Sequence, residues 1–237
     1  MTRSPVLILQ HLSADGPAYL GTWLSRQGVP FEVRNTQAGE AYPDDLHRYA
    51  ALAILGGEMS ANDPLPSLRQ AERLILQAMA MGKPVIGHCL GGQLMARALG
   101  MTVGDSPAPE VGWQPMTVTD TPAAVDWFGA AGPRVVYQWH YEAFDLPPHA
   151  ERLAGSAACP NQAFAVGPHL GMQFHIEIDD EKLARWAQEQ GARFLEAQAL
   201  FPTVQDGPTM LADAARHMAT HQALANRLYA RWLGGVR

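Results

Sequence analysis

The sequence predicts an α/β fold: a doubly wound, mainly parallel sheet with a small peripheral antiparallel region and C-terminal helices. Three observations lead to this prediction. Short, uninterrupted apolar runs alternate with helical patterns through residues 1–100, which is typical of parallel strands buried on both faces. Between residues 101 and 159, prolines, glycines and aromatic residues become more frequent around short apolar runs. Helical periodicity returns after residue 179 and continues towards the C-terminus.

The parallel part of the sheet is expected from four apolar runs and the helices between them. The expected strands cover residues 5–10, 31–34, 51–55 and 84–88. The expected helices cover residues 17–27, 67–81 and 90–99. Each helix is followed by a glycine (Gly28, Gly82 or Gly100), and a residue without a Cβ readily adopts the left-handed conformation that ends a helix. This alternation of strands and helices predicts parallel pairing.

The second half of the chain is expected to complete the sheet and add helices. Residues 116–119 and 135–139 are expected as antiparallel or peripheral strands, and residues 163–166 and 171–175 as a return of the parallel core. A helix capped by Asp179 or Asp180 should follow. The last helix, beyond Pro202, carries one apolar stripe: Leu211, Ala214, Met218, Ala225, Leu228 and Trp232. No repeat or linker divides the sequence, so one domain over 1–237 is expected, with a helical extension over about 203–237.

Composition limits the partners and the location of the chain. The net charge of -6 and the scattered 17 lysines and arginines argue against binding to nucleic acid or to an anionic membrane. No apolar stretch reaches the ~18 residues of a membrane span. The first apolar run ends at Gln10, which is too short for a signal peptide. A cytoplasmic location is therefore expected, where the two cysteines, Cys89 and Cys159, would stay reduced.

One of these cysteines lies where a strand is expected to turn sharply into a helix. The segment at residues 87–93 reads GHCLGGQ, and its glycines give room for a crowded turn that lifts Cys89 clear of the sheet. The positive end of the following helix favours a thiolate, and the free N–H of Leu90 can donate to an oxyanion. The alternative is a cysteine buried as a small apolar residue, which is the common case. A base near Cys89 would distinguish a catalytic cysteine from a buried structural one.

The segment at residues 171–177 (GMQFHIE) offers that base. If it is an extended strand, His175 and Glu177 point to the same side near its carboxyl end, where doubly wound sheets build their sites and where Cys89 emerges. An imidazole oriented by a carboxylate can take the thiol proton and return one to a leaving amine. A solvated pair at a strand end is the alternative interpretation, which the nearby cysteine turn and the preceding buried strand disfavour.

Four sequence blocks together resemble the class I (triad) glutamine amidotransferases, specifically stand-alone proteins similar to the amidotransferase domain of GMP synthase. The blocks are residues 55–60 (LGGEMS), the Cys89 turn, residues 139–147 (WHYEAFDLP), and residues 159–164 (CPNQAF) leading to the His175 segment. The resemblance implies a flavodoxin-like core and a triad of Cys89, His175 and Glu177. It also implies an oxyanion hole formed by the backbone of Gly57 and Leu90, and no cofactor.

The resemblance also places a glutamine pocket, and the sequence departs from the family near it. The residues implied to line this pocket are Met59, Gln93, Trp139, His140 and Tyr141. Ile176 replaces the usual proline of the family, but the spacing of the pair survives. Glu58, His88 and Gly92 also differ from the residues that are common at these places. These departures bear on the identity of the substrate more than on the chemistry.

Three functions remain open at this point. The first is hydrolysis of the γ-amide of glutamine to glutamate and ammonia through a γ-glutamyl thioester, with a separate synthetase subunit as the expected ammonia acceptor because the chain leaves no length for a ligase domain. The second is independent hydrolysis of γ-glutamyl peptides or amines. The third is a non-catalytic thiol-sensing or binding protein, which the complete triad disfavours.

A metal site is not expected. The histidines and cysteines to consider are His88, Cys89, His140, Cys159, His169 and His175. Their spacing matches no paired zinc pattern, and the side chains of an adjacent His-Cys pair point apart on a strand.

Overall fold

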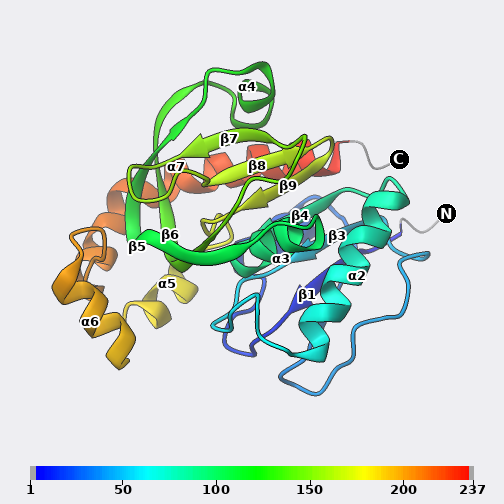
Figure 1. The fold of residues 1–237 in the computed structure, drawn as a ribbon, viewed down its shortest axis with the longest axis horizontal. Coiled ribbons are helices and arrows are strands. Elements are labelled where there is room, and N and C mark those ends of the chain that lie inside the picture. Colours follow the sequence, from blue (N-terminus) through cyan, green and yellow to red (C-terminus); the bar gives the residue numbers. More distant parts are fainter. Residues whose placement is uncertain (1–3, 235–237) are drawn as a thin grey trace.

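The computed structural model describes residues 4–234 as a mixed sheet with helices on both faces (Figure 1). The strands are β1 (Val6–Gln10), β2 (Phe31–Asn35), β3 (Ala51–Ile54), β4 (Val85–His88), β5 (Val103–Val118), β6 (Gly132–Phe144), β7 (Glu151–Gly155), β8 (Ala163–Val166) and β9 (His169–Met172). The helices are α1 (Ala18–Arg26), α2 (Pro66–Ala80), α3 (Leu90–Ala98), α4 (Pro122–Phe128), α5 (Asp180–Trp186), α6 (Ala192–Leu200) and α7 (Gly207–Leu233). The strand order is β2-β1-β3-β4-β9-β8-β7-β5-β6.

The parallel half of the sheet confirms the prediction from the first hundred residues. Strands β2, β1, β3, β4 and β9 pair in parallel, and every residue of β1, β3 and β4 is buried. The predicted glycine caps are also present. At the end of α2, for example, Gly82 has a φ of 66° and its N–H donates to the carbonyl of Met79, while the N–H of Lys83 donates to that of Ala78.

The antiparallel half is larger than the small peripheral region that the sequence predicts. Strands β5 and β6 form a long antiparallel pair, and β7 links β5 to β8. The expectation that residues 163–166 belong to the parallel core is wrong, because β8 pairs antiparallel with β9. Two residues, Gly167 and Pro168, separate these strands, and a connection this short can only join antiparallel neighbours.

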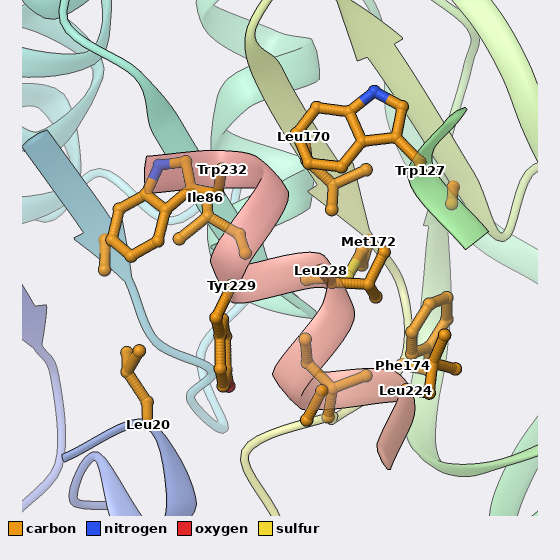
Figure 2. Packing of buried hydrophobic residues seen from close by; sticks show 14 of the residues in the cluster. Leu20, Ile86, Trp127, Leu170, Met172, Phe174, Leu224, Leu228, Tyr229 and Trp232 are labelled. Carbon is orange, nitrogen blue, oxygen red and sulfur yellow. The ribbon is translucent and has the colours of Figure 1, made fainter. Parts of the chain in front are cut away.

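Helices cover both faces, so the doubly wound α/β prediction is confirmed. One buried cluster unites α2 and α3 with one face of the sheet, and a second unites α1, α4 and α7 with the other. Figure 2 shows Leu228 and Trp232 of α7 beside Ile86, Leu170 and Met172 of the central strands. The predicted C-terminal extension therefore packs on the core of its own chain, although residues 235–237 lie outside the described part.

Within α7 one residue of the predicted apolar stripe is misplaced. Leu211 is 48% exposed, whereas its neighbour Met210 is buried and the buried face continues through Met218, Ala225 and Leu228. One residue along a helix turns the side chain by about 100°, so Met210 and not Leu211 starts the stripe. No helix between residues 4 and 234 is long and apolar enough to cross a membrane.

Candidate active site

Cys89 lies between β4 and α3 in a strained backbone conformation. Its φ of 48° and ψ of -107° are unusual for a residue with a side chain, and such strain is typical of functional turns. Its N–H donates to the carbonyl of Met172 on β9 at 2.9 Å, which fixes the turn to the neighbouring strand. A Cβ on Gly91 or Gly92 would overlap the backbone oxygen of Ile54 or Met172. The turn therefore requires glycine at the second and third residues of α3, Gly91 and Gly92.

His175 and Glu177 lie next to each other, but not on a strand as predicted. Strand β9 ends at Met172, and both residues belong to the turn between β9 and α5. His175 Nδ1 and Glu177 Oε1 are 2.7 Å apart. The backbone of His175 is fixed on both sides: its N–H donates to the carbonyl of Tyr137, and its carbonyl accepts from His221 Nε2 of α7 at 2.9 Å. These two hydrogen bonds fix the backbone of the turn that carries the imidazole.

The structure brings the imidazole and the sulfur together. Burial alone would lower the pKa of His175, but the charges of Glu177 and Cys89 and hydrogen bonds to both raise it to about 10. Burial would likewise raise the pKa of Glu177, but Lys182 and His175 hold it well below its ordinary value. At neutral pH the pair is therefore an imidazolium beside a carboxylate. Cys89 is only 6% exposed, yet its sulfur is not sealed in the core, because it lines a cavity together with His175.

The sulfur has two further polar neighbours. Gln173 Nε2 donates to Cys89 Sγ at 3.6 Å, and the sulfur lies 3.5 Å from the carbonyl oxygen of Trp139. Gln173 is fully buried, and the side-chain amide of Gln93 donates to it at 3.5 Å. Gln173 was not among the residues predicted from the sequence, because a glutamine on a buried segment gives no local signal of its contact with the cysteine.

Gly57 and Leu90, the residues of the two predicted oxyanion donors, lie close to each other. Leu90 starts α3, so its N–H belongs to the first turn and has no partner within the helix. A Cβ on Gly57 would lie 2.9 Å from Leu90 Cδ2 and 2.6 Å from Met59 Sδ, so the backbone of Gly57 is close to both. Gly57 and Cys89 line the same cavity. An oxyanion hole formed by the N–H groups of Gly57 and Leu90 stays a prediction.

The cavity over Cys89 has a volume of about 530 Å³. All five residues of the predicted pocket line it: Met59, Gln93, Trp139, His140 and Tyr141. Its outer wall comes from α5 and α6. Phe194 stacks on Trp139 with ring centroids 5.5 Å apart, and Arg193 lies over the ring of Tyr141. Helix α6 was not predicted from the sequence, so this wall was missed.

The cavity lining is rich in charge of both signs. The acidic residues are Asp15, Glu58, Glu142 and Glu189, and the basic residues are Arg185 and Arg193. Glu142 is held by Ser60, whose hydroxyl donates to it at 2.9 Å. A lining with both signs suits a small molecule that carries an ammonium and a carboxylate.

A group with metal-ligand chemistry lies beside the cavity, formed by Glu110, His140 and Cys159. His140 Nε2 lies 3.1 Å from Glu110 Oε2, and Gln162 Nε2 donates to the same oxygen. Cys159 Sγ donates to the carbonyl of Asn161 at 3.6 Å, and burial raises the pKa of its thiol to about 11. The prediction of a metal-free site stays a prediction.

The geometry defines an α/β protein with a cysteine at a strained strand–helix turn, paired with an imidazole that a buried carboxylate orients. The model of the glutamine amidotransferase class-I family matches residues 22–184, which is more than half of the chain. The chain therefore belongs to the class-I glutamine amidotransferases, and the resemblance seen in the sequence is confirmed.

Relatives and solved structures agree with this family. The glutamine amidotransferase-like protein YfeJ of Salmonella typhimurium is 33% identical over 199 residues, covering 77% of this chain and 82% of that protein. A GMP synthase of Aeropyrum pernix is 32% identical over 160 residues, which cover 67% of this chain but only 30% of the synthase. The crystal structure of a glutamine amido transferase from Methylobacillus flagellatus superimposes with a TM-score of 0.94 at 36% identity, covering 100% of this chain and 96% of that chain.

Proposed function

We propose that the protein is a cysteine amidase that hydrolyses the γ-amide of glutamine to glutamate and ammonia. The observation that carries this proposal is the contact of Cys89 with an imidazole that Glu177 orients from 2.7 Å, at the wall of an open cavity. Membership of the glutamine amidotransferase family supports glutamine as the substrate.

The reaction proceeds in two halves. The sulfur of Cys89 attacks the γ-carbonyl carbon, and the N–H groups of Gly57 and Leu90 stabilise the oxyanion. His175 then gives its proton to the leaving nitrogen, the C–N bond breaks, and ammonia leaves a γ-glutamyl thioester on the sulfur. Water, deprotonated by His175, attacks the thioester, and the breaking C–S bond releases glutamate and restores the sulfur. Glu177 stabilises the imidazolium, which is present before the first proton transfer and forms again when water is deprotonated.

A separate synthetase subunit is the proposed acceptor of the ammonia. One relative, from Methanospirillum hungatei, is named as a single subunit of a glutamine-hydrolysing GMP synthase and not as a whole synthase. It is 33% identical over 103 residues, which cover 41% of this chain and 53% of that subunit. This supports a chain that works beside a separate partner.

A second candidate function is hydrolysis of γ-glutamyl peptides or amines, and the size of the cavity favours it. A volume of about 530 Å³ lies within the range of roughly 300–1,000 Å³ that holds drug-sized ligands, which is more than free glutamine needs. Arg193 and Phe194 of α6 line this cavity and offer a cation and an aromatic ring to a group attached to the γ-nitrogen.

Glutamate release by the purified protein tests both candidates. Glutamine, γ-glutamyl dipeptides and a γ-glutamyl alkylamide are the substrates, and Cys89→Ala should lower the rate by about 10⁴–10⁶-fold. The matched control is Cys159→Ala, which removes the other free cysteine and should leave the rate nearly unchanged. Glutaminase activity that rises with an added synthetase supports the first candidate, and cleavage of peptides without glutaminase activity supports the second. No turnover together with no labelling of Cys89 by a glutamine-analogue electrophile would contradict both.

A further inference from the structure

A fully buried lysine lies behind the triad, where the amidase reaction does not require one. Lys182, near the start of α5, has no exposed surface, and lysine is almost never buried without a charged partner. Its ammonium forms ion pairs with Glu177, at 3.1 Å, and with Asp15. It also donates to the carbonyl of Gly16 at 3.3 Å and lies 4.9 Å from the ring centroid of Trp186. Two carboxylates, a carbonyl and an aromatic ring, all groups that attract a cation, thus surround the ammonium.

Lys182 and the catalytic imidazole share one carboxylate oxygen. Glu177 Oε1 accepts from Lys182 Nζ at 3.1 Å and lies 2.7 Å from His175 Nδ1. Within residues 4–234, Oε2 of the same carboxylate has no hydrogen-bond partner. The orientation of Glu177 towards His175 therefore depends on the two cations at Oε1, and only one of them takes part in the chemistry.

The local sequence places Lys182 in this position. The side chain of Asp179 caps α5 by accepting from the backbone N–H of Lys182 at 2.9 Å, which fixes the first turn of the helix. One turn further along, Trp186 packs its ring edge-on against His175, with centroids 4.8 Å apart. Trp186 therefore contacts both the catalytic imidazole and the lysine, and the stretch from 175 to 186 builds them as one unit.

The remaining titratable groups that face Glu177 carry no charge at neutral pH. Burial lowers the pKa of His88 and lowers that of His221 to about 4, so both imidazoles are neutral. Burial raises the pKa of Tyr229, so its phenol is also neutral. Apart from the sulfur of Cys89 on the far side of the imidazole, the charges that balance Glu177 are therefore His175 and Lys182, with Asp15 as the second partner of the lysine.

We propose that Lys182 and Asp15 are positioning residues that hold the Glu177 carboxylate charged and aimed at His175, and so set the pH range in which the triad works. The inference rests on the proposed function. Without the ammonium, two buried carboxylates, Asp15 and Glu177, would face a single imidazolium. Two carboxylates that share a site cannot both stay ionised easily, and the loss of Lys182 removes a cation that holds the pKa of Glu177 low, so Glu177 becomes easier to protonate. A protonated Glu177 no longer stabilises the imidazolium.

Removal of the charges one by one tests this arrangement. In Lys182→Met we expect kcat at pH 7 to fall by up to about 100-fold with little change in KM, and the acid limb of the kcat profile to move to higher pH. The double variant Asp15→Asn/Lys182→Met removes one charge of each sign and leaves the pair of Glu177 and His175 balanced. Its acid limb should return to the wild-type position, with kcat within about tenfold of wild type.

The matched control is Lys83→Met. Lys83 also binds backbone carbonyls, those of Leu46, His47 and Tyr49, but it precedes β4 and lies at the end of the strand opposite Cys89. It should keep the wild-type pH profile. Alkylation of Cys89 by iodoacetamide, followed over pH, gives a readout that needs no substrate. It separates this inference from the proposed function, because alkylation can be measured even if no γ-glutamyl amide is hydrolysed.

The pH profiles of the two variants can either support or overturn the proposed role of Lys182 and Asp15. A shift of the kcat or alkylation profile to higher pH in Lys182→Met, reversed in the double variant, supports the proposal. If Lys182→Met does not fold, a folded double variant with the wild-type profile still supports it. A wild-type profile in Lys182→Met, or an equal loss in both variants without a shift, overturns it. Loss of the fold in both variants also overturns it, since Lys182 would then serve the core and not the triad.

Discussion

Replacement of Glu177 by glutamine is the most informative single change in the triad. The side chain of Glu177 is fully buried, and glutamine has nearly the same shape as glutamate. The substitution therefore removes a charge with little change in volume. The pKa of His175 is about 10 in the presence of this carboxylate, and burial alone would place it below the ordinary 6.5. This difference corresponds to roughly 5 kcal/mol of imidazolium stabilisation, to which Glu177 and Cys89 both contribute and Glu177 contributes the largest single share.

The loss of most of this stabilisation predicts a large effect on the rate. A barrier higher by about 4–5 kcal/mol corresponds to a rate about 10³–10⁴-fold lower. The same range, about 10⁴, is found when the orienting acid of a serine protease triad is replaced by its amide. We therefore expect kcat for glutamate release by Glu177→Gln to fall by about 10³–10⁴-fold, with KM changed much less.

Two assays and one control variant complete the test. Alkylation of Cys89 by iodoacetamide at pH 7 should become slower, because a neutral imidazole stabilises the thiolate less than an imidazolium does. The control is Glu110→Gln, which removes the carboxylate of another buried His–Glu pair and should leave the alkylation rate unchanged. A Glu177→Gln variant with kcat within tenfold of wild type and an unchanged alkylation rate would refute the reasoning.

Three further predictions concern the turn, the cavity wall and the pH dependence of stability. Gly91→Ala should lower the free energy of unfolding by more than about 2 kcal/mol in urea titrations, because its Cβ would overlap a backbone oxygen, whereas Gly104→Ala, with open space around it, should be nearly neutral. Phe194→Ala should raise KM by about 3–10-fold with kcat nearly unchanged, because it removes the stacking on the cavity wall, and Leu195→Ala on the exposed side of α6 should change neither constant. The raised pKa of His175 means that its contribution to stability is complete below pH 6.5 and is lost as the pH rises through about 10. The melting temperature should fall over this interval in wild type and less in His175→Gln, and equal falls in the two proteins would contradict the assignment.

The parallel half of the fold could be predicted because its signals are local. Uninterrupted apolar runs mark strands buried on both faces, and glycines such as Gly82 mark helix ends. The antiparallel half gives no such signal. Strand β5 includes several prolines and exposed polar residues, so only the segment near Met116 resembles a strand. Its partner β6 supplies the pairing that makes the whole segment extended, and that pairing is not visible in the sequence of either strand.

The residues of the candidate site also divide into those that have a local sequence signal and those that have none. Cys89 and Leu90 could be predicted because a cysteine among glycines at a strand end is a local pattern. The spacing of His175 and Glu177 was interpreted as a strand, but the contact of the two side chains arises in a turn that Tyr137 and His221 hold in place. Lys182 gives no local signal, because a lysine in the first turn of a helix is usually solvated, and only the tertiary fold places Asp15 against it.

The central claim is that the sulfur of Cys89 carries the γ-glutamyl group during turnover. Acid quenching of the protein during hydrolysis of glutamine, followed by peptide mass spectrometry, measures this directly. The account predicts a glutamyl adduct on the peptide that contains Cys89, absent from the peptide that contains Cys159. Glutamate release that proceeds at the wild-type rate in Cys89→Ala, with no adduct on this peptide in the wild-type protein, would contradict it.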